Sequence, residues 1–210
     1  MNTELLPFSE QSAKKAAEIM AAGGVVGIPT ETGYGLAADA RNEAAVRSIF
    51  EAKGRPQDNP LIVHISALEQ LPPLVREIPE LALKIAEKYW PGPLTMIFPK
   101  SDMIPAATSG GLDTVAVRMP ESPAARAIID ACGFPLAAPS ANLSGSPSPT
   151  TAQHVMNDMN GRIPLIIDGG ECRCGVESTV LCFPAADRVR ILRPGGVTAE
   201  RLAELGQAHY

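Results

Sequence analysis

The chain has 210 residues and a mass of 22.1 kDa, with 45% hydrophobic and 20% charged residues, which is the composition of an ordinary globular protein. This composition excludes a disordered or fibrous protein, and the length is sufficient for a core without disulfides or a structural metal. The net charge of -5 and the pI near 5.3 argue against nucleic acid or anionic membrane as the main partner. Any phosphate site must therefore be a local cluster of cations.

Hydrophobic periodicity and turn residues predict helices and strands in an irregular order. Ser9 and Asn42 are predicted N-caps, and Gly23 and Gly54 are predicted to end the same two helices. The predicted helices span residues 10–22, 43–53, 79–89, 122–132, 151–159 and 198–205. The predicted strands span residues 25–28, 61–65, 94–98, 114–119, 136–138, 164–167, 178–183 and 189–192. This order favours one α/β domain over residues 1–210, with a twisted mixed sheet flanked by helices.

Cysteine content and the first residues predict a reduced, cytoplasmic protein. The four cysteines are few for this length, and the polar N-terminus lacks the apolar segment of a signal peptide. No apolar stretch approaches the roughly 20 residues of a membrane span, so we expect no membrane association. The pair Cys172 and Cys174 lacks the spacing of a zinc site, and with three histidines in the chain we expect no protein metal centre.

Two nucleotide-binding motifs are excluded by their structural context. Residues 33–38 (GYGLAA) match a loose dinucleotide fingerprint, but that motif must open a helix, and Asp39, Arg41 and Asn42 delay the next helix. The chain contains no Walker sequence. Polar residues instead follow the predicted strands in several short segments, each of which is an ordinary turn when taken alone.

Four charged or titratable residues have an ordinary structural interpretation, and some of them also a functional one. Lys53 and Arg55 could neutralise the end of the helix before them or form a fork for phosphate oxygens. His64 lies in a predicted strand and, by itself, reads as a buried histidine with satisfied hydrogen bonds. Arg118 ends a buried strand, so its guanidinium needs an anionic partner, for which carboxylate or phosphate would serve equally.

Read together, the polar segments resemble the YrdC-like family of threonylcarbamoyl-AMP synthases. The resemblance covers most of the chain and runs through PTETGYGLAADA (29–40), IFEAKGRPQDNPLIVHI (49–65), WPGPLTMIF (90–98), VAVRMP (115–120), PLAAPSANLSGSPSPTTAQHV (135–155), DGG (168–170), GVESTV (175–180) and ILRPGG (191–196). It implies a single α/β domain around a concave, locally positive cavity. It also implies a reaction that joins L-threonine, bicarbonate and ATP into threonylcarbamoyl-AMP and pyrophosphate, the first step toward threonylcarbamoyladenosine in tRNA.

The resemblance also implies roles for individual residues. The catalytic group would be Lys53, Arg55, Ser140 and Asn142. ATP would bind to Arg55, Asn59, Thr114, Ser140, Asn142, Ser148 and Arg193. Threonine would bind to Thr32, His64, Arg118, Ala138 and Ser178, with Arg118 facing its carboxylate. Magnesium is expected to arrive with ATP, because the sequence suggests no carboxylate cage for it.

Two features depart from the family pattern. The family commonly has valine where this chain has Gly33, which is expected to loosen the loop beside Thr32, and glycine where it has Ala37. The chain also ends shortly after the RPGG segment, so we expect the short form without a second domain.

We expect the product to pass to a tRNA-modifying transferase complex and direct tRNA binding to be weak or absent. The alternatives are a structured-RNA-binding module, disfavoured by the net charge of -5, and a carbamoyl-transfer relative with another acceptor.

Overall fold

A computed structural model describes residues 1–54 and 59–210, and its strands form one mixed sheet. The strands are β1 (Glu4–Pro7), β2 (Val26–Pro29), β3 (Tyr34–Asp39), β4 (Ile62–His64), β5 (Leu94–Pro99), β6 (Thr114–Arg118), β7 (Leu136–Ala137), β8 (Leu165–Asp168), β9 (Thr179–Ala185), β10 (Arg188–Arg193) and β11 (Gln207–His209). In space they follow the order β1-β8-β2-β3-β7-β4-β6-β5-β9-β10-β11. Parallel pairs, such as β4 with β6, and antiparallel pairs, such as β2 with β3, both occur.

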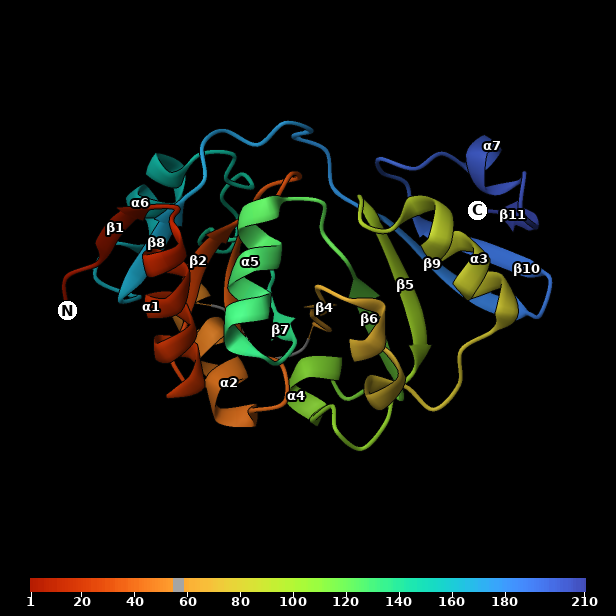
Figure 1. The fold of residues 1–210 in the computed structure, drawn as a ribbon, viewed down its shortest axis with the longest axis horizontal. Helices are drawn as coiled ribbons and strands as arrows, with labels where there is room; N and C mark the ends of the chain where they lie inside the picture. The colour runs from red at the N-terminus through yellow and green to blue at the C-terminus, as the bar shows by residue number, and fades with distance from the viewer. Residues whose placement is uncertain (55–58) are drawn as a thin grey trace.

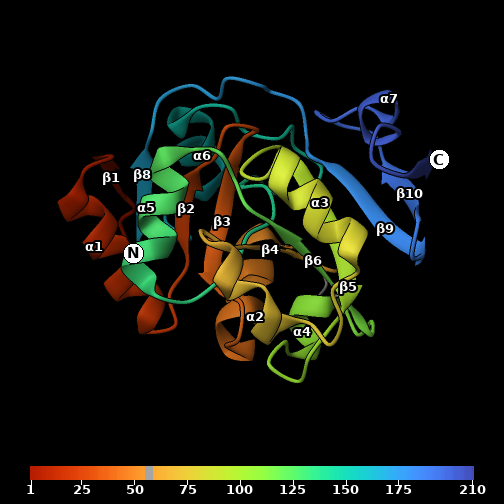
Figure 2. The same cartoon turned by 45° about the vertical axis from the view of Figure 1, so that its right-hand side comes forward.

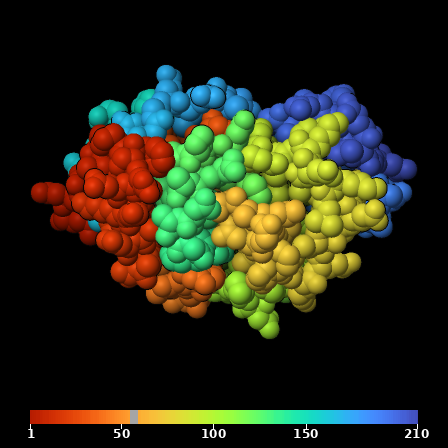
Figure 3. All heavy atoms as spheres, in the orientation of Figure 1, coloured from red at the N-terminus to blue at the C-terminus, as the bar shows by residue number. Residues whose placement is uncertain are grey.

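Helices lie against the sheet along most of its length (Figure 1). They are α1 (Glu10–Ala21), α2 (Glu43–Lys53), α3 (Glu80–Tyr89), α4 (Ala106–Ser109), α5 (Pro123–Cys132), α6 (Ala152–Met159) and α7 (Ala199–Leu202), with short 3-10 turns at Leu68–Gln70 and Pro72–Leu74. Figure 3 shows α1, α5 and α3, in red, green and yellow, spread across one face of the molecule. The predicted α/β class, with a mixed sheet flanked by helices, is confirmed.

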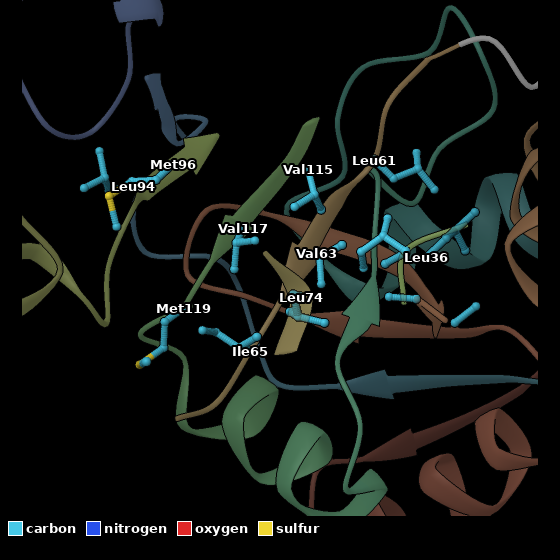
Figure 4. Close-up of a cluster of buried hydrophobic side chains, with 14 of the residues drawn as sticks. Leu36, Leu61, Val63, Ile65, Leu74, Leu94, Met96, Val115, Val117 and Met119 are labelled. Atoms are coloured by element: carbon cyan, nitrogen blue, oxygen red, sulfur yellow. The ribbon is translucent and has the colours of Figure 1, made fainter. Parts of the chain in front are cut away.

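Around β2, helices cover both faces of the sheet. The side chains of its neighbouring strand β8 show this. Leu165 and Ile167 belong to one buried cluster with Met20 of α1, whereas Ile166 belongs to another with Val155 of α6. Side chains of a strand alternate between the faces, so helices cover both sides of β8. The second cluster continues under β4, β5 and β6, where Figure 4 shows its side chains gathered together.

The predicted helix ends are confirmed for the first two helices. The Ser9 side chain accepts a hydrogen bond from the backbone N–H of Ser12, and Asn42 caps α2 in the same way. Gly54 ends α2 with a φ of 64°, a left-handed conformation that glycine adopts without steric strain. The predicted helix over 198–205 is wrong in length, because α7 ends at Leu202.

Residues 34–39 lie outside every predicted helix and strand, but they form strand β3, hydrogen-bonded to β2 and β7. All but the last of these residues are buried, so the polar-apolar alternation of a half-exposed strand is missing. At Gly35 an added Cβ would lie 3.2 Å from the Cβ of Ala138, so a larger residue would force the neighbouring loop to shift. Strands β1 and β11 and helix α4 were not predicted either.

The connection between β8 and β9 crosses the molecule from one half of the sheet to the other. Figures 1 and 2 show this crossover segment (residues 169–178) in blue along the top edge. Among the hydrogen bonds that hold it, the N–H of Cys172 donates to the carbonyl of Thr150, and the N–H of Cys174 donates to the carbonyl of Glu31. The crossover segment thereby reaches loops that follow β2 and β7.

Candidate functional site

A cavity of about 250 Å³ opens where β3, β4 and β6 meet the loop after β7 and the end of the crossover segment. The predicted site residues that line it are Thr32, His64, Arg118, Ala138, Ser140, Ser148, Ser178 and Arg193. The predicted residues that do not line it are Lys53, Asn59, Thr114 and Asn142. Arg55 lies outside the described residues.

The cavity has a buried part and an open part. We call the residues assigned to threonine, Thr32, His64, Arg118, Ala138 and Ser178, the wall, because all but the half-buried Thr32 are buried. We call Ser140, Ser148, Glu177 and Arg193 the rim, because each is partly or fully exposed. The wall comes mainly from strands and strand ends, whereas the rim comes mainly from loops.

Arg118 is the charged centre of the wall. Its Nη2 forms an ion pair with Oε1 of Glu31, its Nη1 donates to Oγ1 of Thr32 at 2.8 Å, and its Nε donates to the carbonyl of Gly92 at 3.1 Å. Burial lowers the pKa of Arg118 to about 10, which still leaves the guanidinium charged at neutral pH. The anionic partner that the sequence required is therefore a carboxylate within the chain.

His64 lines the wall as a neutral side chain. Burial lowers its pKa to about 4, so the imidazole carries no charge at neutral pH. Its Nδ1 lies 3.1 Å from the carbonyl of Ile62. The ring is thus both a histidine with a satisfied hydrogen bond and a surface of the cavity.

Ser178 joins the wall to the rim. Its Oγ lies 2.8 Å from Oγ1 of Thr95 and accepts a hydrogen bond from Nη2 of Arg193 at 3.1 Å. Arg193 also donates to the carbonyl of Ser178 and lies 3.4 Å from the carboxylate of Glu177. The guanidinium of Arg193 is therefore held beside the cavity by its own neighbours.

Lys53 lies beneath the loop that follows β7. Its ammonium group donates to the carbonyls of Ser140, at 2.5 Å, and Asn142, at 2.8 Å. The side-chain amide of Asn142 donates in turn to the carbonyls of Leu143 and Ser146. These two predicted residues hold the shape of the loop that brings Ser140 and Ser148 to the cavity, and the phosphate fork of Lys53 with Arg55 stays a prediction.

The turn between β2 and β3 is held by Thr30. Its Oγ1 donates to the carbonyl of Gly33 at 2.6 Å and accepts from the N–H groups of Thr32 and Gly33. These hydrogen bonds fix the backbone beside Thr32, although Gly33 was expected to loosen it. A Cβ at Gly33 would lie 3.2 Å from the carbonyl oxygen of Pro149, so a valine would need that loop to shift slightly.

Sequence reasoning missed four residues that shape the cavity: Thr30, Glu31, Tyr34 and Thr95. The Tyr34 hydroxyl donates to the carbonyl of Gly170 at 2.7 Å, which ties β3 to the crossover segment. The buried strand position of Arg118 signalled an anionic partner, either a carboxylate or a phosphate. Nothing in the sequence identified it as Glu31, which is 87 residues away.

The structure also bears on metals, disulfides and membranes. Among the described residues, no group of three or more His, Cys, Asp or Glu side chains could hold a metal ion. The four cysteines are free thiols. In the part of the chain that the structure describes, no helix combines the length and apolar character needed to cross a bilayer.

The chain is similar over nearly its whole length to proteins that carry the name of an enzyme. It is 53% identical over 198 residues to a protein named threonylcarbamoyl-AMP synthase from Pyrococcus abyssi, and the match covers 94% of this chain and 58% of that protein. It is 50% identical over 209 residues to a Bacillus subtilis protein of the same name, covering 99% of this chain and 60% of the relative. The chain thus spans about 60% of the length of these relatives.

A solved structure and a family model agree with these matches. The crystal structure of Pyrococcus abyssi Sua5 complexed with L-threonine superposes with a TM-score of 0.93 at 49% identity, covering 99% of this chain and 63% of that one. The family model of Sua5, YciO and YrdC, described as telomere recombination, matches residues 18–195. By its sequence and its fold, the chain belongs to the Sua5/YciO/YrdC family.

Proposed function

We propose that the chain catalyses the synthesis of threonylcarbamoyl-AMP and pyrophosphate from L-threonine, bicarbonate and ATP. One observation carries the proposal: a single cavity is lined by all five residues assigned to threonine and by three of those assigned to ATP. Relatives at 53% and 50% identity bear the name of this enzyme, and a structure at 49% identity is described as a complex with L-threonine. These names support the same proposed activity.

The wall is suited to an amino acid. The guanidinium of Arg118 would bind the carboxylate of threonine, and the buried Ser178 hydroxyl would offer a partner to its polar groups. The methyl group of Ala138 provides an apolar contact for the threonine methyl group, a contact worth about 1–3 kcal/mol against serine. A valine side chain would leave a polar group of the wall without a partner, so it would be rejected more strongly.

The rim is suited to the phosphates of ATP. The neutral amine of threonine and bicarbonate form a carbamate with release of water, and a carbamate oxygen then attacks the α-phosphorus while pyrophosphate leaves. Two anions must meet in this step, so catalysis depends on cations and on positioning. Arg193 and the hydroxyls of Ser140 and Ser148 line the cavity where the phosphates would lie. Arg55 and Lys53 complete the proposed cationic group.

Magnesium would enter with the phosphates of ATP. Glu177 is the one carboxylate among the described residues that line the cavity, which is too few ligands for a protein cage. We assign no step to the metal. The product would pass to a tRNA-modifying transferase complex in the cytoplasm, without membrane attachment and with weak or no direct binding of tRNA by this chain.

The proposal is tested by pyrophosphate release from the purified protein with ATP and bicarbonate, in the presence and absence of L-threonine. We expect threonine-dependent release, a product with the mass of threonylcarbamoyl-AMP, and loss of both in Lys53→Ala and Arg55→Ala. Lys84→Ala, on the exposed side of α3, is the matched control and should retain full activity. Release that is equal without threonine, or no release at all, would contradict the proposal and favour a relative with another acceptor.

A further inference from the structure

Glu31 is a buried carboxylate that holds two parts of the chain together. Its Oε1 pairs with Nη2 of Arg118, and its Oε2 accepts hydrogen bonds from the backbone N–H groups of Glu121 and Ser122, both at 3.0 Å. Ser122 is the N-cap of α5, so the carboxylate lies at the positive end of that helix. The side chains of Arg118 and Glu31 are only 4% and 6% exposed, so solvent does not screen their ion pair.

Every partner of the Glu31 side chain is a donor that cannot accept. A guanidinium and two backbone N–H groups offer hydrogen atoms and no lone pairs. A glutamine at this position would turn its amide nitrogen toward one of these donors and leave that donor without a partner. The site is therefore built for a carboxylate rather than for any polar side chain of this size.

The side chain of Glu31 is buried beside a second cavity. Glu31 and its neighbour Thr30 border this cavity of about 660 Å³, which also reaches the first turn of α5 and the crossover segment. The ion pair with Arg118 and the two backbone hydrogen bonds set where the two carboxylate oxygens of Glu31 lie. The orientation of the Arg118 guanidinium then depends on the hydrogen-bond acceptor that the side chain at position 31 offers.

Arg118 retains donors for a ligand. Of its five N–H groups, the contacts to Gly92, Thr32 and Glu31 use three, which leaves two within the described part of the chain. A carboxylate accepts two parallel N–H bonds from a guanidinium only when the plane of the guanidinium is correct. A partner that fixes this plane therefore controls how well a carboxylate binds.

We infer that Glu31 is a positioning residue for the amino-acid substrate: by holding Nη2 of Arg118, it aims the remaining N–H groups at the substrate carboxylate. This inference rests on the proposed function. The backbone carbonyl of Glu31 also holds the N–H of Cys174, so the same residue anchors the crossover segment that carries Ser178. The positions of two wall residues, Arg118 and Ser178, thus depend on Glu31, which does not line the cavity itself.

The test compares Glu31→Gln with Glu121→Gln, which makes the same chemical change on an exposed neighbour. For Glu31→Gln we expect KM for L-threonine to rise about 10- to 100-fold, the effect of losing a charged hydrogen bond. KM for ATP should stay within about twofold, and Glu121→Gln should match the unmodified protein in both. Glu31→Asp keeps the charge but is one methylene shorter, so its KM for L-threonine should lie between those of the other two proteins.

The outcomes separate this inference from the proposed function. If the unmodified protein neither binds L-threonine in calorimetry nor releases pyrophosphate with it, the proposed function fails. If the unmodified protein is active and Glu31→Gln has an unchanged KM for L-threonine, or equal rises in both KM values, the inference alone fails. Should Glu31→Gln not fold, Glu31→Asp decides: a selective rise in KM for L-threonine supports the inference, and an unchanged value overturns it.

Discussion

The wall and the rim of the cavity are built in opposite ways. The wall consists of side chains such as Arg118 and His64, which are buried, hydrogen-bonded to the chain and placed on strands. The rim consists of partly exposed side chains such as Ser148 and Arg193. For the proposed function, this difference means that discrimination between amino acids would be set when the protein folds, whereas contacts to phosphate groups would be made at a surface that water reaches. Changes in the wall should therefore alter stability and activity together, and changes in the rim should alter activity alone.

The largest effect is expected from Arg118→Met. This change removes the proposed partner of the substrate carboxylate and leaves the carboxylate of Glu31 buried without its cation. We expect a loss of about 3–5 kcal/mol in the free energy of unfolding, measured by urea denaturation, and loss of L-threonine binding in calorimetry. A variant as stable as the unmodified protein would show that the wall is not coupled to folding.

The next effect is a dependence of stability on pH that originates from His64. Its folded-state pKa of about 4 lies below the ordinary 6.5, so the unfolded chain binds more protons between these values. The stability that His64 contributes is thus present above pH 6.5 and is lost as the pH falls toward 4, by up to about 3 kcal/mol. Urea denaturation at pH 7 and pH 5 should show this loss.

The control for that measurement is a change at the surface. His64→Leu should flatten the pH dependence, whereas His209→Gln, at an exposed position of β11, should leave it intact. If both variants keep the full dependence on pH, His64 is not its source.

A smaller effect is expected from Tyr34→Phe. The lost hydroxyl bridges the carbonyl of Gly170, at 2.7 Å, and the N–H of Gly169, at 3.1 Å. We expect about 1–2 kcal/mol less stability in urea and a lower rate of pyrophosphate release, because the crossover segment is held less firmly. Tyr89→Phe loses one hydrogen bond to the carbonyl of Arg201 away from the cavity, so it should lose some stability but keep its activity.

The smallest effect on stability is expected at the rim, from Arg193→Gln. Because this side chain is partly exposed, the free energy of unfolding should change by less than about 1 kcal/mol. KM for ATP should rise about 3- to 10-fold, and high salt should reduce the difference from the unmodified protein. Arg190→Gln, exposed on the same strand, is the matched control. If Arg193→Gln lost as much stability as Arg118→Met, the expected difference in stability between changes in the wall and changes in the rim would be contradicted.

Local signals in the sequence predicted most elements of the fold. Ser9, Asn42 and Gly54 mark helix ends because capping depends on neighbouring residues. Strand β3 was missed because it contains no β-branched residue and almost all of its residues are buried, so neither β propensity nor a period of two reveals it. Its partner β7 lies about 100 residues further along the chain, which no local pattern can reflect.

The site was predicted as a set of residues rather than as a geometry. The resemblance named the residues of the wall, and all of them line one cavity. It did not indicate that Lys53 would hold the carbonyls of Ser140 and Asn142, or that Glu31 would hold Arg118. These contacts join segments that are 87 to 89 residues apart, so they depend on the completed sheet.

The position of β8 has a consequence for synthesis on the ribosome. β1, at residues 4–7, emerges long before its sheet partner β8, at residues 165–168. β2 can pair early with β3, but β1 must wait until the chain has been made as far as residue 168. During that interval its backbone and the apolar face of α1 lack their final partners, which exposes the nascent chain to wrong pairings. Slower translation would lengthen this interval, so the order of strands links the yield of folded protein to the speed of elongation.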